Sequence, residues 1–145
     1  MNIKGVIEYL LQALQVVQNK AARFVSRRGK YTPIAELLRQ CGWLSVKQLV
    51  FYHSVLQIYK TILTTYPKYI NSKLATQFPY NTRLAESDSV RMGSEFKCKL
   101  ELTEKSFMSR ATISYNKLPS ELRKITKLEK FKNELKEWVQ SNVKL

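Results

Sequence analysis

The spacing of apolar residues predicts a long helix near the N-terminus. Between residues 3 and 28, apolar side chains recur in steps of three or four and form one stripe along a helix. The stripe contains Val6, Leu10, Leu14, Val17, Ala21 and Phe24. Gly29 then offers a C-terminal stop, because glycine readily adopts the left-handed conformation that commonly ends a helix.

A short second helix is predicted from its terminal signals. Thr32 can act as its N-cap, Pro33 suits the first helical position, and Gly42 follows its last turn. Proline is tolerated at the start of a helix because its missing N–H would have no intrahelical partner there.

A third helix is predicted to begin at Ser45. Ser45 and Gln48 have the spacing of a capping box, in which each side chain accepts a hydrogen bond from the other residue's backbone N–H. The segment that follows is apolar on nearly all sides, so we expect it to run through the centre of the core, with His53 buried there as a hydrogen-bonded histidine. Tyr66-Pro67 ends it.

The C-terminal third predicts two helices that meet at a corner. Thr103 is expected to cap the first of them, and Pro119 stops it, because proline lacks the backbone donor and clashes with the preceding turn. Thr126 and Glu129 have capping-box spacing for the last helix. The apolar stripe of that helix contains Leu128, Phe131, Leu135 and Trp138.

The expected fold is mainly α: a compact bundle of about five helices, with a short irregular or β segment before the last two helices. A chain of 145 residues is long enough for one domain with a buried core. We expect a helical N-terminal part (1–64), an irregular part (71–102) and the C-terminal helices (103–143). Short strands in the middle part are suggested by the alternation Phe96, Cys98, Leu100 and Leu102.

The charge of the chain predicts a polyanionic partner. There are 25 Lys and Arg against 11 Asp and Glu, a net charge of +14. Nucleic acid is the leading candidate, followed by an anionic membrane surface and an acidic protein. If the first helix persists to its frayed end, Lys20, Arg23, Arg27 and Lys30 share one exposed face, and Arg28 flanks them. Such a face could hold phosphates, or it could simply be solvated.

A second basic group surrounds the corner after Pro119. It includes Arg123, Lys124 and Lys127, and extends to Lys130 and Lys132. Glu121 and Glu129 are interleaved with these residues, so internal salt bridges compete with phosphate binding. Exposed aromatic side chains could also stack on unpaired bases; the candidates are Tyr31, Tyr66, Tyr69 and Tyr80.

Catalytic and metal chemistry has little support in the sequence. Cys41, Cys98 and His53 are too few for a zinc cluster or a disulfide framework, and Asp88 is the single aspartate. We expect no enzyme activity, no cofactor and no metal site. The N-terminal segment reads as an amphipathic helix and no stretch reaches the length of a membrane span, so we expect a nuclear or cytoplasmic protein with no membrane partner.

Several motifs resemble one known family when taken in order. These motifs are LQVVQNKAARFV, CGWLSVKQLVFYHSVLQIYKTI, PKYI, NTR, SFMSRA, YNKLPSELR and FKNELKEWV. Their order and spacing, over roughly residues 13 to 143, resemble the tail of metazoan non-long-terminal-repeat retrotransposon polyproteins of the jockey-like kind. That tail lies downstream of an endonuclease and a reverse transcriptase. The family more often has Trp-Asn where this chain has Tyr115-Asn116, and the polymerase motif Y-x-D-D has no counterpart here.

The resemblance implies a nucleic-acid context and a retroelement origin, without polymerase or nuclease activity in this chain. The leading hypothesis is an accessory domain that binds RNA or DNA phosphates without sequence specificity, with the reverse transcriptase of a parent element as a further partner. One alternative is a helical protein-interaction or oligomerisation module. The other is a degenerate retroelement remnant with no independent function, since the motifs begin almost at Met1.

Overall fold

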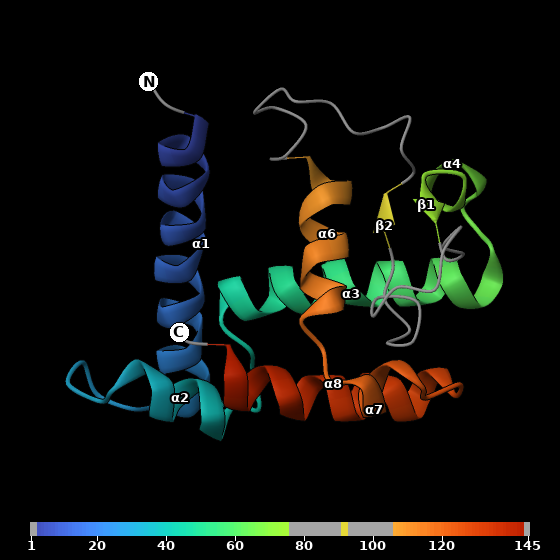
Figure 1. Ribbon diagram of the computed structural model, residues 1–145. Helices are drawn as coiled ribbons and strands as arrows, with labels where there is room; N and C mark the ends of the chain where they lie inside the picture. The colour runs from blue at the N-terminus through green and yellow to red at the C-terminus, as the bar shows by residue number, and fades with distance from the viewer. Residues whose placement is uncertain (1–2, 76–90, 93–105, 144–145) are drawn as a thin grey trace. The chain divides into compact units, whose positions relative to one another are not determined.

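The chain is mainly α-helical, as the sequence predicts. A computed structural model describes residues 3–75, 91–92 and 106–143, which form seven helices and two very short strands (Figure 1). The helices are α1 (Ile3–Ser26), α2 (Ile34–Gln40), α3 (Val46–Thr64), α4 (Lys68–Asn71), α6 (Phe107–Asn116), α7 (Ser120–Arg123) and α8 (Leu128–Asn142). The strands β1 (Leu74–Ala75) and β2 (Arg91–Met92) pair antiparallel, with Leu74 opposite Met92.

The chain divides into two compact units. The first unit contains Met1–Val50 together with Val139–Leu145, and the second contains Phe51–Trp138. Helices α3 and α8 therefore contribute residues to both units. Each unit is described by itself below, and the expectation of one compact domain stays a prediction.

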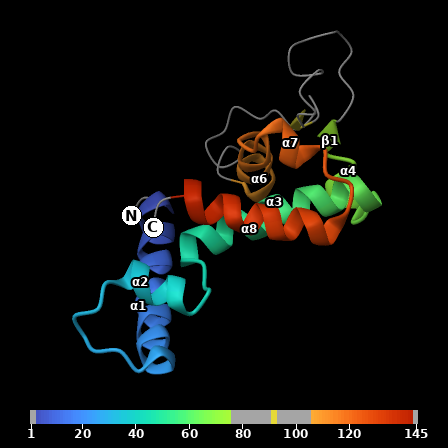
Figure 2. The ribbon, with the colours of Figure 1, turned by 90° about the horizontal axis from the view of Figure 1, so that it is seen from below.

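In the first unit, α2 lies beside the C-terminal part of α1 (Figures 1 and 2). Leu37 and Leu38 of α2 are buried against Ala22 of α1, and Ile34, Cys41 and Trp43 pack around them. Gly42 ends α2 as predicted, with a left-handed φ of 67°. The N–H of Gly42 donates to the carbonyl of Arg39 (3.1 Å) and that of Trp43 to Leu38 (2.8 Å), the two bonds of a Schellman motif.

The start of α2 differs from the prediction. Pro33 is the N-cap of α2 and not its first helical residue, and no side chain caps this end. The predicted cap by Thr32 is wrong, because Thr32 belongs to the preceding turn, where its N–H donates to the carbonyl of Gly29 (3.2 Å).

The predicted capping box at the start of α3 is confirmed. The N–H of Ser45 donates to Oε1 of Gln48 (2.9 Å), and the N–H of Gln48 donates to Oγ of Ser45 (3.3 Å). The Nε2 group of Gln48 also donates to the carbonyls of Val139 (3.4 Å) and Val143 (2.8 Å) at the end of α8. One buried amide therefore pairs with the N–H of Ser45 at the beginning of one helix and with the carbonyl of Val143 just after the end of another.

Helix α1 is attached to this unit by amide side chains. Oε1 of Gln15 accepts from the N–H of Val46 (2.9 Å), and Nε2 of Gln18 donates to the carbonyl of Leu44 (2.7 Å). The predicted apolar stripe lies along one side of α1, and every one of its members is exposed. The helix turns its glutamines toward the fold and its apolar stripe away from it.

The second unit has an apolar core built from α3, α6, α7 and α8. Phe131 and Leu135 of the predicted α8 stripe are fully buried, while Leu128 and Trp138 are half-buried. The Tyr59 ring stacks on Phe131, with ring centroids 3.7 Å apart, and its hydroxyl donates to the carbonyl of Ile125 (2.7 Å). A phenol is protonated and can donate at neutral pH, and burial raises the pKa of the Tyr59 phenol further. The other buried residues of this core are Val55, Leu56, Ile58, Ile70, Ala111, Tyr115, Leu118 and Leu122.

The corner before α8 has the predicted stop but a different cap. Helix α6 ends at Asn116, and Pro119 is the N-cap of the short helix α7. Ser106 caps α6, with its Oγ accepting from the N–H of Ser109 (3.3 Å). The predicted cap Thr103 lies outside the described residues.

The strands expected from the alternation at residues 96–102 lie outside the described residues, and the two strands that are described contain two residues each. One further expectation does not hold. His53 is exposed and lies edge-on to Tyr52, with ring centroids 5.3 Å apart, so it is not a core histidine. Val50 is exposed as well, three residues earlier, which shows that α3 is not buried on all sides.

Replacing Leu135 with alanine should lower the free energy of unfolding by ~2–5 kcal/mol, because the side chain is fully buried and its removal leaves a cavity. Denaturant titration measures this. Leu63→Ala is the matched control on a 47% exposed leucine of the same unit, and should change stability by less than about 1 kcal/mol. Equal effects of both variants would show that α8 does not pack as described.

Replacing Gln48 with alanine should lower the free energy of unfolding by ~1–3 kcal/mol, because the buried N–H of Ser45 and the carbonyl of Val143 lose the partner that the Gln48 side chain provides. Gln12→Ala, which removes an exposed amide, should stay within about 0.5 kcal/mol. If Gln48→Ala matches Gln12→Ala, the three hydrogen bonds of the Gln48 side chain contribute nothing net to stability.

Candidate nucleic-acid interface

The first basic group is divided between a helix and a turn. Helix α1 ends at Ser26 because Arg27 adopts a left-handed φ of 51°, and the N–H of Arg27 then donates to the carbonyl of Phe24 (3.4 Å). The helix therefore does not reach Lys30, which was the condition for a single basic face, and the predicted stop at Gly29 is wrong. Lys20 and Arg23 remain on α1, whereas the other three basic residues leave it.

Residues 27–31, here called the basic turn, project their side chains into solvent. The bond from the N–H of Thr32 to the carbonyl of Gly29 closes a four-residue turn, with Lys30 and Tyr31 at its two central positions. Side chains at the two central positions of a turn point away from the chain segments that the turn connects. All five residues of the basic turn are exposed, and Tyr31 reaches 94%.

Tyr31 is placed differently from the other candidate aromatic residues. Tyr66 and Tyr69 are also exposed, at 69% and 67%, but they belong to the second unit, near α4. Tyr80 lies outside the described residues. Tyr31 follows Lys30 directly, so an aromatic face and cationic groups occur together on one short turn. Composition alone could not distinguish it from the other seven tyrosines.

Lys20 and Arg23 flank the basic turn on the last two turns of α1. Lys20 is exposed, but Arg23 is partly buried, and its Nε atom is buried without a hydrogen-bond partner. The expectation that the Arg23 side chain is fully exposed is therefore wrong. Its aliphatic stem is better described as part of the packing of α1.

The positive charge of this group is uncompensated within the described part of the chain. None of the five side chains Lys20, Arg23, Arg27, Arg28 and Lys30 forms an ion pair with a described acidic residue. Like charges this close repel each other, and a phosphate backbone would relieve that repulsion.

The second basic group has a different electrostatic character. Arg123 is partly buried at the end of α7, and Lys124 and Lys127 are exposed in the segment that leads to α8. Ion pairs follow directly: Lys132 lies 2.6 Å from Glu129, and Lys130 lies 3.6 Å from Glu134. The predicted competition from internal salt bridges is thus confirmed for the two lysines on α8. The two basic groups belong to different units and are treated as separate surfaces.

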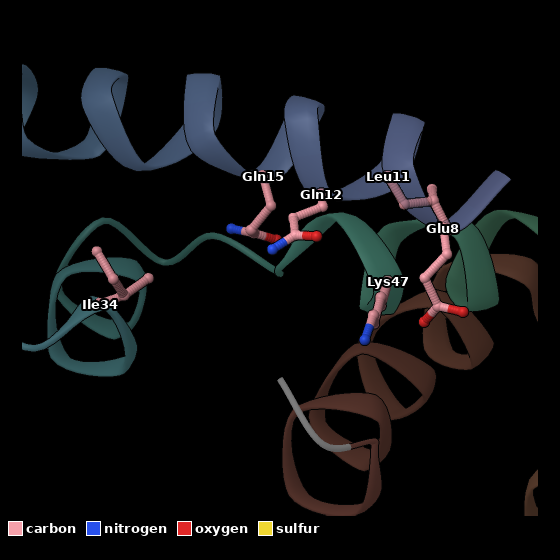
Figure 3. Close-up of a pocket in the computed structure, with 6 residues that line it drawn as sticks. All are labelled: Glu8, Leu11, Gln12, Gln15, Ile34 and Lys47. Atoms are coloured by element: carbon pink, nitrogen blue, oxygen red, sulfur yellow. The ribbon is translucent and has the colours of Figure 1, made fainter. Parts of the chain in front are cut away.

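The first unit also contains a hollow that the sequence did not suggest. It has a volume of about 320 Å³, and Figure 3 shows side chains from α1, α2 and the start of α3 around it. Its lining consists of Glu8, Leu11, Gln12, Gln15, Ile34 and Lys47. A carboxylate and an ammonium group occur together there, so the hollow has no net preference for phosphate.

The described residues contain neither a metal-ligating cluster nor a helix that could span a membrane. No group of three or more His, Cys, Asp or Glu side chains that could hold a metal occurs in residues 3–75, 91–92 and 106–143. Over the same residues, no helix combines the length and the apolar character needed to cross a membrane.

Comparison of the chain with models of protein families, with curated proteins and with solved structures gives no match. The resemblance to retrotransposon polyprotein tails therefore stays a prediction from the motifs of the sequence.

Proposed function

We propose that this chain is a non-catalytic nucleic-acid-binding domain that holds the phosphate backbone of RNA or DNA without reading its sequence. The basic turn is the observation that supports this best. Arg27, Arg28 and Lys30 are exposed there, form no ion pair with a described acidic residue, and adjoin the exposed ring of Tyr31.

The chemistry of such a turn suits a single strand. Arg and Lys neutralise phosphates and release condensed counterions, which drives binding in a sequence-independent way. Every base has a π-face, so a tyrosine ring can stack on an unpaired base whatever its identity. In a duplex the bases are already stacked on each other, and only the phosphate contacts remain. We therefore favour single-stranded RNA or DNA as the ligand.

The rest of the charge supports association at longer range. A net charge of +14 attracts a polyanion from beyond contact distance and raises the rate of encounter. Lys124 and Lys127, exposed on the second unit, could hold further phosphates of a long strand. Arg123 would act more weakly, because it is partly buried.

This binding role agrees with the tail position that the motifs suggest. A tail that holds template RNA or the new DNA strand would keep the nucleic acid near a reverse transcriptase without doing chemistry itself. The reverse transcriptase of a parent element is accordingly a proposed partner, and the nucleus or cytoplasm the proposed location.

Changing Arg27 and Arg28 together to glutamine should weaken binding to all sequences equally. The slope of log K against log salt should become less steep by up to about two units, since each neutralised phosphate contributes about 0.7–0.9. Arg23 is left unchanged because its buried Nε is part of the packing. Fluorescence anisotropy with labelled single strands at several salt concentrations measures both quantities.

The matched control is Lys130→Gln with Lys132→Gln, which removes the same charge from lysines already paired with glutamates. It should change the salt slope much less. Equal slopes for the two double variants would mean that only net charge matters and that the basic turn is not the binding surface.

Tyr31→Ala should weaken binding to single strands by about 5- to 150-fold, corresponding to about 1–3 kcal/mol for one stacked base. Duplex binding should hardly change, and Tyr31→Phe should keep most of the affinity because the ring remains. Tyr69→Ala, at an exposed tyrosine of the second unit, is the control. Equal losses for single strands and duplexes would contradict base stacking by Tyr31.

A further inference from the structure

Helix α1 exposes nearly all of its apolar surface. From Val6 to Ser26, where side chains of this helix are described, Ala22 alone is buried. The exposed fractions are 55% for Leu10, 56% for Leu14, 64% for Val17 and 86% for Phe24. An apolar strip of this length on one helix marks a surface that binds something.

The exposure follows from the way α1 is attached. Its inner face contains Leu11, Gln15, Gln18 and Ala22, and the two glutamines make the hydrogen bonds to Leu44 and Val46. At about 100° per residue, the centre of the apolar stripe lies about 120° around the helix axis from that face. Rotating α1 to bury the stripe would break both hydrogen bonds.

Helix α1 would gain stability if its exposed apolar stripe packed against another surface. Most helical stability in proteins comes from packing an apolar face rather than from intrinsic propensity. The N-terminal part of α1 extends past α2 (Figure 1), and none of its side chains from Val6 to Ala21 is buried. Packing of the stripe would therefore stabilise the helix itself as well as any complex.

We propose that a second copy of this chain covers the stripe, with its own α1 running antiparallel. When two identical helices pair antiparallel, the residue numbers of facing positions have a constant sum. A sum of 27 places Val6 opposite the second copy's Ala21, Leu10 opposite its Val17, and Ala13 opposite its Leu14. Each of these positions is apolar and exposed. The stripe is therefore complementary to itself.

Charge selects the antiparallel orientation. In a parallel pair, Lys20, Arg23 and the basic turn of each copy would lie beside the same positive groups of the other. In an antiparallel pair, the two basic turns lie at opposite ends, about 40 Å apart for about 13 residues on each side of the midpoint. That separation exceeds the screening length of about 10 Å at 0.1 M salt, so the repulsion is small.

The stripe offers apolar area to a partner helix. A standard interface buries about 800 Å² on each partner, and a buried aromatic side chain accounts for about 150–250 Å² of such area. Six large apolar side chains that are at least one-third exposed lie on or beside the stripe: Val6, Leu10, Leu14, Val17, Phe24 and Val25. Lys20, Arg23 and the basic turn lie at one end of the stripe, an arrangement that matches a membrane surface less well than it matches a second copy.

Sedimentation of the full chain over a wide range of concentration tests the pairing. The parent should pass from monomer to dimer, whereas Leu14→Glu and, separately, Val17→Glu should weaken dimerisation at least tenfold. Ile113→Glu, at a 54% exposed isoleucine of the second unit, is the control and should dimerise like the parent. Thermal unfolding checks that each variant is folded. If one variant is not folded, the concentration dependence of the parent still tests whether the chain dimerises.

Disulfide trapping tests the orientation in a background with Cys41→Ser and Cys98→Ser. A mixture of Leu10→Cys and Val17→Cys chains should form mostly mixed disulfides if the helices are antiparallel. Disulfides formed mainly between identical chains would overturn the antiparallel pairing. A parent that stays monomeric at every concentration would overturn the dimer, and binding of that monomer to phosphatidylserine vesicles would identify a lipid surface as the occupant instead.

Discussion

The first unit depends on the buried side-chain amide of Gln48. This one group accepts from Ser45 at the start of α3 and donates to Val139 and Val143 at the end of α8. Helix ends leave backbone groups unpaired, and burying them without partners is costly. Because Gln48 meets that requirement for two helices at once, it fixes which turn of α3 lies beside which turn of α8. A leucine of similar size could fill the space but could not set this register.

The same need for hydrogen bonds explains why the apolar stripe of α1 is exposed. The first backbone N–H of α3 is taken by Gln15, and the carbonyl of Leu44 just before it is taken by Gln18. The hydrogen bonds of these two glutamines therefore decide which face of α1 packs against the rest of the first unit. The apolar stripe is left for a different role, and the basic turn is held at the end of a helix whose rotation is fixed.

Much of the fold follows from short-range sequence patterns that can be recognised without the structure. The Ser45 and Gln48 capping box, the left-handed Gly42 and the stop at Pro119 each depend on neighbouring residues, so they were predicted correctly. The orientation of α1 depends on hydrogen bonds to residues 26 and 31 positions away, which no local pattern contains. For the candidate site, the basic residues were evident from composition. The left-handed Arg27 was not, because a positive φ at arginine is uncommon.

The hydrogen bond from Gln48 to Val143 also affects how the chain folds during its synthesis. It joins residues 95 positions apart, and the first unit consists of residues from both ends of the chain. The second unit, by contrast, is one continuous segment. On a ribosome, α1 emerges first, but neither unit can be completed before α8 emerges, because α8 contributes Phe131 and Leu135 to the second unit and the carbonyls that bind Gln48 to the first. Until then α1 and its apolar stripe are available to a chaperone or to a neighbouring nascent chain.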